Sequence, residues 1–144
     1  MSQPADTDPT ISAHAAIHTD EAAPAPRYFA QGVRKGSILQ VSGQGALDRA
    51  TGEVLHRDNA AEQTILALEN VSAILAAGGA SIADVVMFRI YLTSRDDYSA
   101  MNQAYERFVD QHVATGPKPC RTTVFVGLPL DGMLVEIDAQ AVVG

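Results

Sequence analysis

The sequence has little of what a disulfide-stabilised or membrane-spanning protein would need. Only one of its 144 residues is a cysteine, Cys120, so no internal disulfide is possible. The N-terminus carries acidic residues and no apolar stretch, which is unlike a signal peptide. No apolar run approaches the length of a bilayer span. We therefore expect a cytoplasmic protein with no membrane partner.

Positive charge is also scarce. The chain has 10 Lys and Arg residues against 17 Asp and Glu residues, which gives a formal net charge of -7. An acidic surface argues against non-specific binding to DNA, RNA or anionic lipid. We expect a small-molecule ligand instead, and an anionic one would need a local positive group.

Several motifs that mark catalysis are missing. The sequence has no phosphate-binding Gly-rich loop, no Gly-x-Gly-x-x-Gly that opens a helix and no Gly-x-Ser-x-Gly elbow. The four histidines, His14, His18, His56 and His112, lack metal-ligand spacing. Cys120 has no histidine near it in sequence, which favours a small, semi-buried side chain over a nucleophile. We predict no metal and no cofactor.

The length and composition favour one globular domain. Hydrophobic residues make up 47% of the chain and charged residues 19%. Residues 1–12 are rich in Pro, Asp, Ser and Thr and are typical of a flexible tail. Residues 13–144 would then form the single domain.

Periodicity predicts two helices among short strands. Asp58 or Asn59 caps a helix that ends before Gly78. Its predicted apolar stripe is Ala61, Ile65, Leu68, Val71 and Leu75. A second helix begins near Asp96 or Asp97, with the stripe Tyr98, Met101, Tyr105, Phe108 and His112. The expected strands are 13–19, 38–42, 85–93, 121–126 and 133–142.

This order of elements predicts an α+β domain, with two helices on one face of a mixed sheet of about six strands. The turn at 128–132 predicts that the last two strands form a hairpin. In the final strand Val135, Ile137, Ala139 and Ala141 alternate with polar residues, which suggests a solvated second face. That face also carries apolar side chains such as Val124 and Val126, and we expect it to meet another subunit.

The candidate site residues lie at strand ends. Ser42 and Gly43 close one strand, where a glycine lets a ligand approach the backbone. Arg121 opens another strand, and its planar fork is the best receptor for a carboxylate. Glu136, expected on the paired strand near Arg121, could position or activate a water. Spacing alone favours a plain Arg121–Glu136 salt bridge across the hairpin.

An ordered set of short segments resembles the RidA (reactive-intermediate/imine deaminase) family. The match runs from about residue 17 to the C-terminus. The matching segments are Gln31-Gly32-Val33, Val41-Ser42-Gly43-Gln44, Thr51-Gly52-Glu53, Gln63, Asn70-Val71, Ala77-Gly78, Asp84-Val85-Val86, Asn102 with Tyr105 and Phe108, Pro119-x-Arg121, Leu128-Pro129, and Val135-Glu136-Ile137 with Ala139 and Ala141.

The resemblance implies a chorismate-mutase-like fold and a homotrimer with sites between subunits. It implies cofactor-free hydrolysis of imines and enamines, such as 2-iminopropanoate and 2-aminoacrylate, to 2-oxo acids and ammonia. By resemblance, Arg121 would hold the substrate carboxylate and Glu136 would hold or activate the water. The backbone at Gly43, beside Ser42, would contact the imine, and Asn102 would support the cleft.

The chain departs from the family pattern at two positions. Phe29 stands where the family often has a tyrosine, with Tyr28 one residue earlier, and Thr123 stands where a cysteine is common. The departures leave two alternatives open. One is a same-fold enzyme acting on a different, pathway-specific enamine or imine. The other is a non-catalytic trimer that binds small carboxylates or acts like a chaperone. Ribonuclease activity is disfavoured by the acidic charge.

Overall fold

The structure, a computed structural model, describes residues 13–144, so the predicted tail at 1–12 lies outside the described residues. Neither described α-helix combines the length and apolarity needed to cross a membrane. The elements are β1 (Ala15–Ile17), β2 (Gly32–Lys35), β3 (Ile38–Gly45), α2 (Ala60–Ala77), η1 (Ile82–Asp84), β4 (Val85–Leu92), η2 (Arg95–Asp97), α3 (Tyr98–His112), β5 (Cys120–Phe125) and β6 (Val135–Val142).

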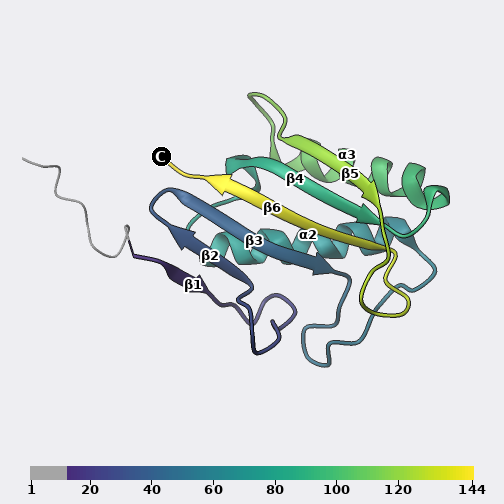
Figure 1. Ribbon diagram of the computed structural model, residues 1–144. Coiled ribbons are helices and arrows are strands. Elements are labelled where there is room, and N and C mark those ends of the chain that lie inside the picture. The colour runs from purple at the N-terminus through teal and green to yellow at the C-terminus, as the bar shows by residue number, and fades with distance from the viewer. Residues whose placement is uncertain (1–12) are drawn as a thin grey trace, which may run out of the picture.

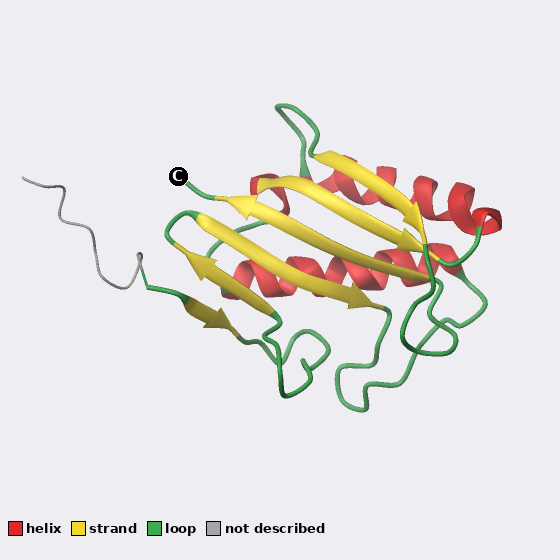
Figure 2. Ribbon diagram, in the orientation of Figure 1, coloured by secondary structure: helices red, strands yellow, loops and turns green. Residues whose placement is uncertain are grey.

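The six strands form one mixed sheet in the order β1-β2-β3-β6-β4-β5 (Figure 1). Helices α2 and α3 lie side by side across one face of this sheet (Figure 2). The predicted α+β architecture is confirmed. The predicted hairpin of the last two strands is wrong, because β4 lies between β5 and β6. Strand β4 pairs parallel with β5 and antiparallel with β6.

Local signals set the ends of α2. The Asn59 side chain accepts a hydrogen bond from the backbone N–H of Glu62 at 3.0 Å, and the N–H of Gly78 donates to the carbonyl of Ile74 at 3.1 Å. Three residues of the predicted stripe, Leu68, Val71 and Leu75, are fully buried, whereas Ala61 and Ile65 are only half-buried.

Polar residues on the buried face of α2 explain that error. The side-chain amide of Gln63 donates to the Gly132 carbonyl at 2.8 Å and accepts from the Leu134 N–H at 2.8 Å. Asn70 donates to the Gly45 carbonyl at 3.2 Å. Both side chains satisfy loop and strand backbone groups, so they are buried at little cost, although a hydropathy pattern assigns them to the surface.

Helix α3 buries the middle of its predicted stripe. Met101, Tyr105 and Phe108 are buried, and the Tyr105 ring meets Phe88 edge-on at a centroid distance of 5.7 Å. The two ends of the stripe, Tyr98 and His112, are exposed instead.

Strand β6 alternates as predicted. Val135, Ile137, Ala139 and Ala141 are fully buried against the helices. The opposite face is not uniformly solvated, because Asp138 is only 7% exposed there. The prediction of a solvated face therefore fails at Asp138, which lies beneath side chains of β4.

Replacing Gln63 with alanine should lower the free energy of unfolding by about 3 kcal/mol, because it leaves buried backbone groups of the 128–134 loop without hydrogen-bond partners. Denaturant unfolding measures the change. The exposed helix residue Gln103 provides the matched control, and Gln103→Ala should stay within about 0.5 kcal/mol of the parent. Equal stabilities for the two variants would contradict the anchoring role of Gln63.

Candidate active site

Arg121 and Glu136 lie on opposite faces of the sheet. Arg121 on β5 pairs with Phe88, which is fully buried against the helices, so its side chain shares the helix-covered face. Glu136 pairs with Tyr91 and shares the uncovered face with Asp138. Strand β4 separates the two, at about 4.8 Å per strand. The expected proximity within one chain is wrong, and the structure has no Arg121–Glu136 ion pair.

The guanidinium of Arg121 is fixed by α3. Its Nη1 donates to Asn102 Oδ1 at 2.8 Å, and its Nη2 donates to the hydroxyl of Tyr98 at 3.0 Å. The cation lies over the Tyr105 ring at 4.8 Å. No carboxylate within residues 13–144 forms an ion pair with it. Arg121 is therefore a cation fixed in place in a groove that Lys118, Glu106 and Asp110 also line.

Burial raises the pKa of Tyr105, and the nearby charge of Arg121 opposes that rise. The ring therefore stays neutral at physiological pH and offers its face to the cation. Thr123, two residues along β5, points to the same helix-covered side. Its hydroxyl oxygen is buried without a hydrogen-bond partner among the described residues. Cys120 is exposed, contrary to the semi-buried side chain predicted from its context.

On the other face, Glu136 borders a hollow beside the bulge in β3. The register of β3 against β6 shifts between Val41 and Gln44, and Gly43 lies within the shift. A Cβ atom on Gly43 would lie 2.8 Å from the Glu136 carboxyl carbon, so only glycine fits without displacing that group. The hydroxyl of Ser42 donates to the Ala30 carbonyl at 2.7 Å and so ties the adjoining loop to the strand.

The hollow is about 340 Å³ and mostly apolar away from Glu136. Phe29 lines it and is 57% exposed, whereas Tyr28 is 88% exposed and is not among the residues that line it. Phe29 is therefore part of the wall of this hollow, and Tyr28 is not. Other apolar wall residues are Pro24, Pro26, Leu47, Pro129, Leu130 and Met133.

Burial raises the pKa of the Glu136 carboxyl, and the charge of Asp138 raises it further. The side-chain carboxylate of Glu136 accepts no hydrogen bond and forms no ion pair within residues 13–144. Asp138, by contrast, is fully engaged. It accepts from Arg89 Nε and from the Tyr91 hydroxyl, each at 2.8 Å.

The sequence analysis missed Arg89 and Tyr91. They alternate along β4 on the same face as Glu136 and Asp138, and all four border one shallow hollow with Ser42 and Gly43. The signal was present in the spacing of Arg89 and Tyr91, because residues two apart on a strand share a face. That spacing does not by itself place Arg89 and Tyr91 beside Glu136, because the pairing of β4 with β6 must also be known.

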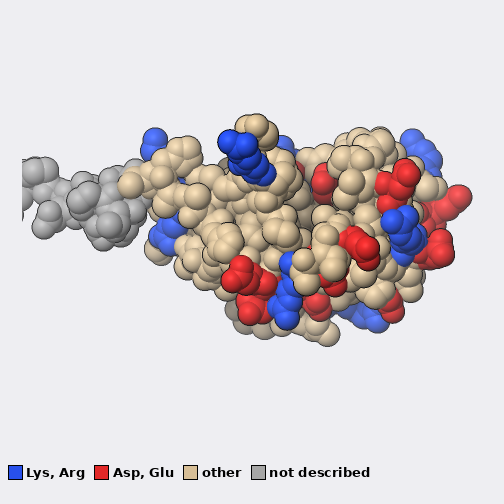
Figure 3. Space-filling model, turned by 90° about the horizontal axis from the view of Figure 1, so that it is seen from below, with Lys and Arg blue, Asp and Glu red and all other residues tan. Residues whose placement is uncertain are grey.

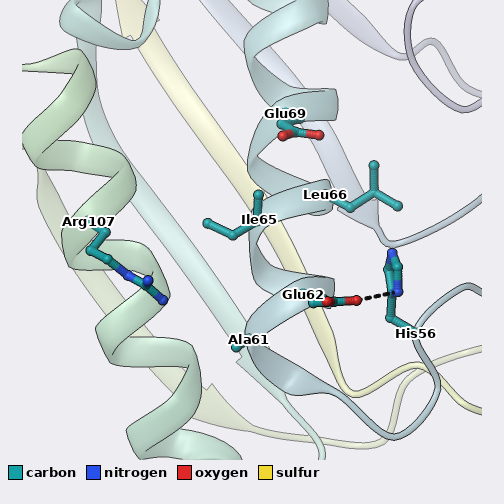
Figure 4. Close-up of a pocket in the computed structure, with 7 residues that line it drawn as sticks. All are labelled: His56, Ala61, Glu62, Ile65, Leu66, Glu69 and Arg107. Carbon is teal, nitrogen blue, oxygen red and sulfur yellow. Dashed lines mark ion pairs between the residues drawn. The ribbon is translucent and has the colours of Figure 1, made fainter.

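A third hollow lies between α2 and α3, on the side of the helices away from the sheet (Figure 4). There His56 forms an ion pair with Glu62 at 2.6 Å, and Arg107 projects from α3 across the groove. It contains neither Arg121 nor Glu136. Arg107 is therefore a suitable control cation for tests of Arg121.

Fold and geometry together define a small α+β domain with a fixed cation on one face of the sheet and a half-buried acid on the other. A family profile described as Endoribonuclease L-PSP matches residues 19–143. TdcF of Escherichia coli is 39% identical over 127 residues, covering 88% of this chain and 95% of TdcF. The 2-iminobutanoate/2-iminopropanoate deaminase of Salmonella typhimurium is 37% identical over the same shares.

Solved structures agree with the sequence matches. The crystal structure of E. coli TdcF with bound serine superposes with a TM-score of 0.82 at 37% identity, over 90% of this chain and 99% of that one. RidA from the Antarctic bacterium Psychrobacter superposes with a TM-score of 0.79 at 31% identity, over 90% and 99% of the two chains. This chain belongs to the RidA family, which includes deaminases.

Replacing Gly43 with alanine should push the Glu136 carboxyl out of its position while leaving the fold stable. The clash involves the end of a flexible side chain, so unfolding free energy should change by less than about 1 kcal/mol. A crystal structure of the variant gives the position of Glu136. Gly127, around which a Cβ meets nothing within 4 Å, supplies the control variant Gly127→Ala. An unmoved Glu136 in Gly43→Ala would refute the proposed contact.

Proposed function

We propose that this protein hydrolyses reactive 2-imino acids and enamines of the 2-iminopropanoate and 2-aminoacrylate type to 2-oxo acids and ammonia, in a homotrimer whose sites lie between subunits. One observation carries the proposal: Arg121 and Glu136 are on opposite faces of one sheet, separated by β4. A small substrate cannot touch both within one chain. A site that uses both must join two chains.

Other features support the same assembly. Arg121 is anchored by Asn102 and Tyr98 yet has no anionic partner among the described residues, as a receptor for a carboxylate requires. Val124 on the edge strand is 39% exposed, so apolar surface on the uncovered face is available for a second copy. The relatives named as deaminases span nearly the whole chain.

The reaction asks little of the protein. Water adds to the C=N carbon of the imine, and the nitrogen gains a proton. The hydroxyl of the resulting carbinolamine then loses a proton, the nitrogen gains one and the C–N bond breaks, which releases ammonia and leaves the 2-oxo acid. An enamine enters the same route after its nitrogen loses a proton and its β-carbon gains one. Ionised Glu136 takes a proton from the attacking water and returns it to the departing nitrogen. Arg121 fixes the substrate carboxylate, so the rate enhancement comes mostly from orientation of the substrate.

The apolar hollow favours one alternative within the same chemistry. Phe29 at the tyrosine position and the wall around Leu130 and Met133 would accommodate a larger apolar side chain than that of 2-iminopropanoate. A panel of imines generated from alanine, leucine and methionine distinguishes the alternatives by their relative kcat/KM. Tight binding of 2-oxo acids without turnover would support a carboxylate-binding protein instead.

The family description raises RNA as a substrate. The charge distribution does not favour it, since blue side chains lie singly among red and tan on the face shown in Figure 3. RNA binding relies on grouped cations that neutralise phosphates, and the chain has net charge -7. Imine hydrolysis needs only one positive group per site.

Arg121→Ala should abolish release of 2-oxo acid from enzymatically generated 2-aminoacrylate while the trimer persists. The loss follows because the substrate carboxylate would have no cationic receptor. A coupled assay of the 2-oxo acid and sedimentation of the variant measure the two outcomes. Arg107→Ala, which removes a cation from the outer helix groove, should retain activity. Full activity in Arg121→Ala would sink the assignment.

A mixing experiment tests whether the site joins two chains. Arg121→Ala and Glu136→Gln should each be inactive alone. Co-refolded in equal amounts, they should recover about a quarter of the parent activity, because one neighbour in four pairs an intact Arg121 with an intact Glu136. A site within one chain predicts no recovery, since no chain carries both residues.

A further inference from the structure

The uncovered face of the sheet carries a second charged arrangement beside Glu136. In the β4–β6 ladder Arg89 is opposite Asp138, and Tyr91 is opposite Glu136. All four side chains border the same hollow. Opposite residues in an antiparallel pair have Cβ atoms about 5 Å apart, so the four groups form one compact polar cluster.

Asp138 is held rigidly within this cluster. Its two carboxylate oxygens are used separately, one by Arg89 Nε and one by the Tyr91 hydroxyl, each at 2.8 Å. The residue is 7% exposed, whereas the Arg89 side chain is half-exposed. Charge-assisted hydrogen bonds of this kind are short and strong, and the hydrogen bond to Asp138 raises the pKa of Arg89.

The fixed charge lies close to the acid of the proposed reaction. Residues 136 and 138 are two apart on one strand and share a face, at about 7 Å. That separation is shorter than the screening length of about 8 Å at physiological ionic strength, so the interaction survives in salt. The cation of Arg89 is farther into solvent and offsets only part of the charge of Asp138.

We propose that Asp138, clamped by Arg89 and Tyr91, is a positioning residue that governs whether Glu136 carries a proton. The inference rests on the proposed role of Glu136 in imine hydrolysis and deepens it. Glu136 must be ionised to take a proton from water and protonated to give it back. A neighbouring negative charge shifts that balance towards the protonated form, and Arg89 limits the shift.

Few other groups that face Glu136 could influence its protonation. Strand β3 offers Ser42 and Gly43, and the preceding loop offers Phe29, none of which carries charge. Strand β4 offers Arg89 and Tyr91, and β6 offers Asp138. Burial is the largest cause that raises the pKa of Glu136, and Asp138 is the charged group that adds to it.

The test exploits the two halves of the ion pair. Asp138→Asn keeps the shape, removes the negative charge and leaves Arg89 in place, so the pKa of Glu136 should fall. Arg89→Gln leaves the charge of Asp138 uncompensated, so the pKa of Glu136 should rise. A purely structural role of Asp138 would shift the titration midpoint of Glu136 in neither variant, or in the same direction in both.

Carbon-13 NMR of the glutamate side-chain carboxyls measures the titration midpoint of Glu136 in the full-length protein. The signal that is lost in Glu136→Gln is assigned to Glu136. The acid limb of the pH dependence of kcat/KM should move with it. Lys35→Gln, which removes a remote cation from β2, controls for net charge and should leave the midpoint unchanged. Should Arg89→Gln fail to fold, Tyr91→Phe removes one donor from Asp138 and should shift the midpoint upward.

Midpoints that move in opposite directions in Asp138→Asn and Arg89→Gln support the inference, and unmoved or parallel midpoints overturn it. The NMR readout does not depend on turnover. Opposite shifts in a protein that hydrolyses no imine would therefore refute the proposed function while leaving the coupling of Asp138 to Glu136 intact.

Discussion

Strand β4 lies between β5 and β6, and the functional proposal depends on that position. It separates Arg121 from Glu136 by a strand, and the pairing registers send the two side chains to opposite faces. One chain therefore holds the cation and the acid of the proposed site too far apart for a small substrate to contact both. The same strand brings Arg89 and Tyr91 next to the acid, so one topological choice both divides the site and builds the cluster around Glu136.

The sequence contained a signal for this topology that was outweighed by the turn at 128–132. Helix α3 separates β4 from β5, and a strand–helix–strand order favours a parallel crossover. The connection from β5 to β6 covers residues 126–134, longer than the two to five residues of a usual hairpin loop. Turn residues such as Pro129 and Gly132 indicated a reversal, but they could not indicate which strand lies beside the next.

Patterns that depend on local geometry were predicted well. The Asn59 cap, the end of α2 at Gly78 and the alternation in β6 each follow from contacts within a few residues or from the period of a strand. The buried face of α2 was predicted only in part, because Gln63 and Asn70 are also buried there and satisfy backbone groups 25 or more residues away in sequence. Such long-range partners turn a polar residue into a core residue, and no periodicity reveals them.

The site residues divide in the same way. Gly43 was singled out because glycine permits close approach, and the approaching group is the carboxyl of Glu136 itself. Arg121 was identified from its place at the start of a strand and Asn102 from the family pattern, and the structure brings the two side chains to 2.8 Å. Arg89 and Asp138 belong to no such pattern, and only the pairing of β4 with β6 associates them with Glu136.

Two carboxylates two residues apart on a half-buried face repel one another, and an ordinary sheet would avoid the arrangement. This chain retains it and adds a cation and a phenol that stabilise one carboxylate only. The pair is thereby made unequal. Asp138 accepts two hydrogen bonds, whereas Glu136, without a hydrogen-bond donor among the described residues, is the member whose pKa is raised by burial and by the charge of Asp138. Environments that push two carboxyl groups apart are a recurrent basis for acid and base roles at neutral pH. The helix-free face of the sheet therefore carries the two carboxyl groups on which the proposed proton transfer depends, and the proposed carboxylate receptor, Arg121, lies on the other face.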